Sequence, residues 1–268
     1  MFRLWKRLRA LWASSRRTSG EPKSANGASS FHLVWEVPQV PLSEVAATLE
    51  VLDPPAVNRL YFWALQVSFA TERRLQGGAH LGLQWNPRFP QDTCVNWGGY
   101  EPAERGSAIL QGSDSELPSA RKDPNTRDYP WKPGRRYRFR IARAPESPDG
   151  VRAWRGTVTD LETGEDTAVR DLFTGGTHLV SPMVWSEVFA RCEQPSVTVR
   201  WSDLVAITAD GEEVRPVRVR VNYQSKADGG CDNTTVGTDE LGLLQITNVE
   251  RRVQQGAIVQ VPGALVER

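Results

Sequence analysis

Hydrophobic and polar residues alternate along most of the chain from Phe31 onward. In segment 60–70 an apolar side chain occupies every second position, and segments 135–142, 197–201 and 217–223 show the same alternation. Successive side chains of a β-strand point to opposite faces, so this pattern predicts strands with one buried and one solvated face.

Turn residues separate these runs, and helical periodicity is almost absent. Pro133-Gly134 and Asp210-Gly211 are typical of tight turns between strands. The sequence therefore predicts an all-β protein, an antiparallel β-sandwich or jelly roll. Segment 42–52, with Ser43 near its start, is a weak helix candidate, and segment 183–190 is ambiguous.

Composition divides the chain into two regions. Residues 1–30 form a basic N-terminal tail and linker, and residues 31–268 form the predicted β-sandwich domain. Segment 210–268 either completes the sandwich or forms a small β extension. We prefer the first interpretation because no internal repeat or linker separates it from the rest.

The N-terminal tail has the pattern of a basic amphipathic helix. Residues 1–17 are therefore predicted to lie on an anionic membrane surface, with a disordered leader or a misassigned start as alternatives. Charges interrupt every apolar run, so no secretory signal is recognised and a cytoplasmic location, peripheral to the membrane, is expected. On a helical wheel, one side carries Leu4, Trp5, Leu8, Leu11 and Trp12.

Charge and cysteine content narrow the classes of function. The chain of 268 residues has a net charge of +1, but residues 1–20 hold six basic residues and no acidic one, so the remainder is acidic. This balance disfavours nucleic-acid binding by the body. Cys94, Cys192 and Cys231 form no CxxC motif, and we expect three reduced thiols, with a Cys192–Cys231 bridge as the alternative.

The loop-rich segment 98–130 and its flanks hold the candidate site. Aromatic rings beside amide, carboxylate and guanidinium groups suit a sugar, which presents an apolar C–H face and a ring of hydroxyls. The alternative to ligand binding is that each Trp is buried in the core. This alternative is weakest for Trp97 and Trp131, which lie beside Gly and Pro. The predicted ligand-binding residues are Trp85, Trp97, Tyr100, Asn125, Arg127, Asp128, Tyr129 and Trp131.

Three oxygen-bearing side chains in this segment suggest a metal site. Asp123, Asn125 and Asp128 lie within six residues and are of the type that calcium prefers. The alternative is that they form Asx turns before Pro124 and Pro130. Calcium is the one cofactor that the sequence suggests, and otherwise none is expected.

Four stretches carry a resemblance to a known family: HLGLQWNP (80–87), VNWGGY (95–100), 123–141 and 181–204. They resemble a bacterial, mostly actinobacterial, family of concanavalin-like β-sandwich proteins of unknown function. The resemblance implies a jelly-roll fold and, by analogy, a link to glycans. It implies no catalytic residues.

The leading hypothesis is a non-catalytic carbohydrate-binding module that uses aromatic loop residues. The alternatives are a carbohydrate-active enzyme on the same scaffold, either a glycoside hydrolase or a polysaccharide lyase, and a membrane-surface interaction protein without a glycan ligand. Glycoside hydrolysis needs two carboxyl groups, and no strand carries a convincing pair, although Glu187 and Glu193 flank a potential groove wall. A lyase site would draw on His80, Gln84, Tyr100, Arg127 and Tyr129.

Overall fold

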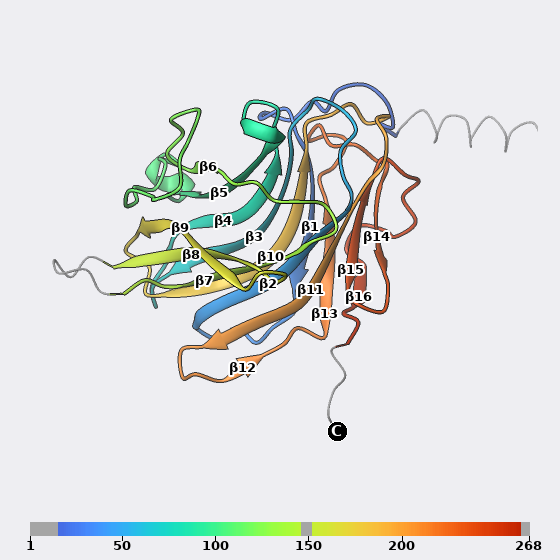
Figure 1. The fold of residues 1–268 in the computed structure, drawn as a ribbon. Helices are drawn as coiled ribbons and strands as arrows, with labels where there is room; N and C mark the ends of the chain where they lie inside the picture. Colours follow the sequence, from blue (N-terminus) through green and yellow to red (C-terminus); the bar gives the residue numbers. More distant parts are fainter. Residues whose placement is uncertain (1–15, 146–151, 264–268) are drawn as a thin grey trace, which may run out of the picture.

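The structure is a computed structural model that describes residues 16–145 and 152–263, and it consists of antiparallel strands and two single-turn 3-10 helices (Figure 1). The first sheet has the strand order β6 (Thr126–Asp128), β5 (Thr93–Tyr100), β4 (Leu75–Trp85), β3 (Tyr61–Ala70), β10 (His178–Val188), β1 (Ser29–Trp35), β13 (Arg218–Tyr223) and β16 (Ile258–Gln260). The second has the order β9 (Glu165–Phe173), β8 (Ala153–Asp160), β7 (Arg136–Arg143), β2 (Leu42–Asp53), β11 (Val197–Thr208), β15 (Leu243–Thr247) and β14 (Thr234–Thr238). The short β12 (Glu213–Val214) pairs with β11, and the 3-10 helices are η1 (Pro90–Asp92) and η2 (Ala103–Arg105).

The two sheets curve toward each other (Figure 1). They enclose one hydrophobic core and meet where Leu179 of β10 pairs with Leu42 of β2. The predicted all-β sandwich is therefore confirmed. The strands of segment 210–268 extend both sheets, since β13 and β16 lengthen the first and β14 and β15 the second.

Large aromatic side chains fill the space between the sheets. Trp63, Trp97, Trp154 and Trp201 are each at most 1% exposed. Aromatic rings of this size remove about 150–250 Å² each from water, so they dominate the energetics of the core. The alternation read from segment 60–70 is confirmed, because its apolar positions face this core.

The helix candidate at 42–52 is wrong. It forms β2, which lies between β7 and β11 and buries Val45, Ala47, Leu49 and Val51 on one face. Pairing on both edges satisfies the backbone and outweighs the local preference for a helix. The ambiguous segment 183–190 is also mostly strand, as the second half of β10.

A disulfide joins Cys192 to Cys231, with Cα atoms 5.7 Å apart. The expectation of three reduced thiols is therefore corrected, and Cys94 alone is a free, buried cysteine. Burial raises the pKa of the Cys94 thiol, which keeps it protonated and unreactive.

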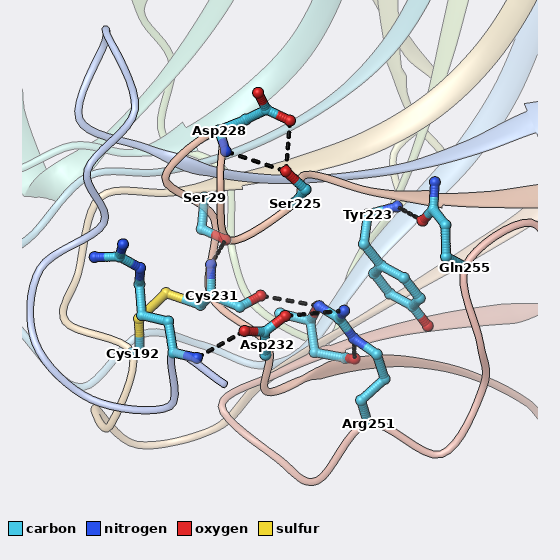
Figure 2. A network of polar contacts seen from close by, with 11 residues as sticks. Ser29, Cys192, Tyr223, Ser225, Asp228, Cys231, Asp232, Arg251 and Gln255 are labelled. Carbon is cyan, nitrogen blue, oxygen red and sulfur yellow. Dashed lines mark hydrogen bonds and ion pairs between the residues drawn. A yellow bond between two sulfur atoms is a disulfide. The ribbon is translucent and has the colours of Figure 1, made fainter. Parts of the chain in front are cut away.

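The disulfide lies in a polar network that anchors the N-terminal segment 16–28 to the sandwich (Figure 2). The Arg17 amide donates to Asp232 Oδ2 at 2.6 Å, and the Cys192 amide donates to the Gly20 carbonyl. Arg251 donates to Asp232 and to the Cys231 carbonyl, and its guanidinium lies 3.9 Å from the centre of the Tyr223 ring. This segment, treated as a linker in the sequence analysis, is therefore part of the folded body, while residues 1–15 of the proposed membrane-binding tail lie outside the described residues.

Candidate functional site

Strand register places polar residues in rows across the outer face of the first sheet. Residues directly opposite one another on paired strands point to the same face, so each row is a line of neighbouring side chains. One row contains Ser30, Glu187, Phe62, Gln84 and Cys94, from β1, β10, β3, β4 and β5. The next contains His32, Trp185, Ala64, Gly82 and Asn96. A third contains Met183, Gln66, His80 and Gly98.

These rows line a hollow of about 760 Å³. A second hollow of about 740 Å³ continues from it and shares Gln66, His80 and Tyr100. We call the combined depression the outer groove. The strands pack closely in the middle row, where a Cβ atom at Gly82 would lie 1.9 Å from the Trp63 carbonyl oxygen.

An aromatic cluster forms the floor of the outer groove. The ring of Phe62 lies edge-on to Trp185 at 4.8 Å and to His80 at 5.4 Å, measured between ring centroids. Trp185 Nε1 donates to Gln66 Oε1 at 2.8 Å. Ring packing and a hydrogen bond thus hold the floor rigid, and a rigid floor positions the polar groups beside it.

Glu187 is the carboxyl group of the floor. Its Oε1 atom accepts hydrogen bonds from Asn26 Nδ2 and Ser30 Oγ, both at 3.1 Å. Burial raises the pKa of Glu187, and the two hydrogen bonds oppose the shift. A carboxyl group with a raised pKa both accepts and donates protons closer to neutral pH, as a general acid–base requires.

Gln84 lies across Phe62 from Glu187. Its Oε1 atom accepts a hydrogen bond from Asn86 Nδ2 at 2.9 Å and faces Cys94 Sγ at 3.5 Å. These contacts fix the amide plane, and no hydrogen bond within the described residues engages its Nε2 group. The Gln84 amide hydrogens are therefore free to donate to a ligand.

Both histidines of the groove are neutral at pH 7. Burial lowers the pKa of His80 to about 4. Burial also lowers the pKa of His32, against a hydrogen bond with the Asn222 backbone. Among the titratable groups of this floor, Glu187 is the one whose pKa burial raises.

The predicted ligand-binding residues divide between this groove and the core. Trp97 is fully buried and Trp131 is 3% exposed, so neither presents a ring to a ligand. Trp97 points inward from β5 against Gly156, and Trp131 packs edge-on to Trp63 while its Nε1 donates to the Gln84 carbonyl.

The other predicted residues are scattered. Trp85 and Tyr129 pack partly buried against the core, and Arg127 is buried beside a different hollow. Tyr100 is 48% exposed on the rim of the outer groove, and Asn125 also lines it. The predicted set therefore contributes Tyr100 and Asn125 to one depression and does not form a single aromatic surface.

The candidate calcium ligands serve the loop itself. Asp123 Oδ1 accepts hydrogen bonds from the backbone amides of Asn125 and Thr126, the Asx turn that was the alternative interpretation. Asp128 accepts from the Ala120 amide, and Asn125 Oδ1 accepts from Arg170 Nη2. N–H donors thus occupy Asp123 Oδ1, both carboxylate oxygens of Asp128 and Asn125 Oδ1, and the calcium site stays a prediction. Within the described ranges, no cluster of three His, Cys, Asp or Glu side chains is arranged for a metal.

The floor as a unit was not predicted from the sequence. Glu187, His80 and Gln84 were candidates under different hypotheses, and Phe62, Gln66 and Trp185 were not singled out. The available signal was a polar residue inside an otherwise apolar strand, as at Gln66 and Gln84. That signal marks the outer face but does not say which strands lie side by side.

No family model matches the sequence, and no curated protein matches it. Among solved structures, the chain is similar to scytalido-glutamic peptidase with a peptide-based transition-state analogue, with a TM-score of 0.42 and 11% identity over 82% of this chain and 98% of that chain. A second structure of that peptidase, with a transition-state analogue inhibitor, has a TM-score of 0.41 and 12% identity over 86% of this chain and 99% of that chain. SCP-B, a member of the eqolisin family of peptidases in complex with the tripeptide Ala-Ile-His, has a TM-score of 0.41 and 11% identity over 82% of this chain and 98% of that chain.

The expected carbohydrate-binding module is wrong. Two of the aromatic residues on which it depended, Trp97 and Trp131, belong to the core. In the part of the chain that the structure describes, no helix has the length and apolar character needed to cross a membrane.

Proposed function

We propose that the protein is a hydrolase of acyl bonds that acts on an extended peptide bound in the outer groove. The observation that carries the proposal is the row in which Glu187 and Gln84 flank Phe62. Neighbouring strands lie about 4.8 Å apart, so the two backbones are about 10 Å apart and both side chains reach toward a bond held between them.

The two groups divide the chemistry of hydrolysis. The Glu187 carboxylate takes a proton from water as the water oxygen bonds to the carbonyl carbon. Negative charge develops on the carbonyl oxygen, where the Nε2–H group of Gln84 donates a hydrogen bond. The carbon–nitrogen bond then breaks, and protonated Glu187 returns its proton to the leaving nitrogen.

The single carboxyl group of this row supports acyl transfer over glycoside hydrolysis. Cleaving a glycosidic bond usually takes two carboxyl groups about 5–10 Å apart. The hollow of about 760 Å³ has one other acidic lining residue, Asp123. Its Oδ1 atom accepts hydrogen bonds from two backbone amides. Apolar rings and amide side chains along the floor suit a peptide, which alternates side chains with backbone donors and acceptors.

The proposal is tested by incubating the purified chain with a mixture of unmodified peptides from pH 3 to pH 8 and identifying products by mass spectrometry. Cleavage is expected, and it should fall as the pH drops below the pKa of Glu187, because the base must be unprotonated. Glu187→Gln keeps the acceptor oxygen for Asn26 and Ser30 but removes the base, and about 100-fold or more of the rate should be lost.

Two further variants complete the test. Gln84→Met fills a similar volume without donors and should lower kcat about 100-fold with a smaller effect on KM. Glu240→Gln removes an exposed carboxyl outside the groove and should leave activity unchanged. Absence of cleavage at every pH, or equal activity in Glu187→Gln, would show that the groove does not perform this reaction.

A further inference from the structure

A separate hollow of about 470 Å³ lies between the loop that follows β5 and strand β9. Residues 109–115 of the loop form one wall, and the 122–127 segment with Arg170 forms the other. Its charged residues are Lys122, Arg127 and Arg170 on the basic side and Asp114 and Asp123 on the acidic side.

Two guanidinium groups are buried at this hollow without a carboxylate partner. Arg127 is 8% exposed and Arg170 is 6% exposed. Neither forms a salt bridge within the described residues, whereas Arg155, also next to β9, pairs with Asp171 at 2.7 Å. Burying a charge is costly unless it is paired, so two adjacent unpaired arginines need a compensating group.

Their hydrogen bonds use only part of each guanidinium. Arg170 donates from Nε to the Trp97 carbonyl at 3.3 Å and from Nη2 to Asn125 Oδ1 at 2.6 Å. Arg127 donates from Nη1 to the carbonyls of Asp123 and Thr126. A guanidinium has five N–H donors, so Nη1 of Arg170 and both Nε and Nη2 of Arg127 keep hydrogens for another acceptor.

The two positive charges act on each other. Burial lowers the pKa of Arg170, and the nearby Arg127 lowers it further, while Asp123 opposes the shift. Burial also lowers the pKa of Arg127, against the effects of Asp123 and Asp114. An anion between the arginines would relieve this repulsion. Asp123 does so only in part, since its Oδ1 already accepts two backbone amides.

The loop packs closely against the Arg170 guanidinium at Gly112. A Cβ atom at Gly112 would lie 3.0 Å from Arg170 Cζ and 2.5 Å from the Asp171 carbonyl oxygen. Glycine at this position therefore lets the loop backbone pass close to the Arg170 guanidinium. Lys122 is exposed and lines the same hollow, where it adds an ammonium group.

We propose that this hollow binds an oxyanion, a phosphate or a carboxylate group, between Arg127 and Arg170, with Lys122 as a further lining residue. Planar guanidinium groups match the oxygens of both anions and bond them in pairs. The site is separate from the outer groove, and the 123–127 segment forms the wall between them, because Asp123 lines both hollows. The proposal does not depend on the hydrolase function.

The proposed anion site is tested by calorimetric titration of the full chain. One arm uses inorganic phosphate and the other acetate, at constant ionic strength set with chloride. Saturable binding of one anion to one site is expected, and the tighter arm identifies its chemistry. Arg170→Gln should weaken binding at least about tenfold, and Lys122→Ala about two- to fivefold.

Arg121→Ala is the matched control, since it removes an exposed neighbouring charge that lines the outer groove and not this hollow. It should change the affinity less than twofold. Circular dichroism checks the fold of each variant. If Arg170→Gln fails to fold, the titrations of Lys122→Ala and the wild type show whether the hollow binds an anion. Absence of saturable heat with both anions, or an equal loss in Arg121→Ala and Lys122→Ala, would overturn the proposal.

Discussion

Glu187 of β10 and Gln84 of β4 occupy the same row of the sheet on either side of Phe62. The chain separation between them is large, and the antiparallel pairing of β10, β3 and β4 brings them together. Asn26, from the N-terminal segment, completes the surroundings of Glu187 through a hydrogen bond. The groove floor thus depends on both the central strands and the segment anchored near the disulfide.

The raised pKa of Glu187 makes the stability of the protein dependent on pH at this position. The folded state binds this proton more tightly than the unfolded state, so stability is lost as pH rises from the ordinary carboxyl pKa, about 4.3, through the folded pKa. Glu187→Gln removes this loss while keeping the hydrogen-bond acceptor. The variant should unfold at higher urea than the wild type at pH 7, and the difference should vanish near pH 3. A lower midpoint at pH 7 would contradict the assignment.

Replacing a buried tryptophan should damage the fold. Trp97→Ala and Trp131→Ala each leave a cavity in the core and should lower the free energy of unfolding by about 3–5 kcal/mol. Tyr100→Ala, on the exposed rim, should change it by less than about 0.5 kcal/mol. Denaturant unfolding followed by circular dichroism measures all three. Equal stability of the two tryptophan variants and the wild type would place the rings at the surface.

The disulfide should stabilise the chain by restricting the unfolded state. It closes a loop with a sequence separation of 39 residues, for which the chain-entropy relation gives about 4 kcal/mol. The double variant Cys192→Ser/Cys231→Ser should lose most of that amount and become insensitive to reductant. Cys94→Ala, which leaves the bridge intact, should stay sensitive. A wild type whose unfolding midpoint does not change with reductant would contradict the prediction.

Replacing Gly82, in the middle row of the outer face, should destabilise the sheet. The Cβ atom of Gly82→Ala would meet the Trp63 carbonyl oxygen at 1.9 Å, so strands must shift, at a cost of about 1–3 kcal/mol. Gly237→Ala, whose Cβ would have no contact closer than 3.5 Å, is the matched control. Thermal unfolding of both variants should separate them by several degrees, and similar midpoints would mean that the strands tolerate the methyl group.

The sequence alone determined the type of fold and many of its local details. Period-two alternation identifies strands because side chains alternate between two faces, and it assigns Trp63 to the buried face correctly. The turns at Gly134 and Gly211 were also predicted from the sequence. Both residues have positive φ angles, 74° and 89°, which favour glycine. These features depend on a few neighbouring residues, which the sequence displays directly.

Tertiary structure decided the rest. Alternation shows that a strand has two faces, but register with a distant partner determines which side chains share a row and which face becomes a groove. Trp97 therefore turned out to be a core residue, segment 42–52 became a strand between two others, and Cys192 met Cys231. Burial and spacing set the environment of Glu187, of Gln84 and of the Arg127–Arg170 pair. Residues far away in the chain contribute to that environment, so no local pattern encodes it.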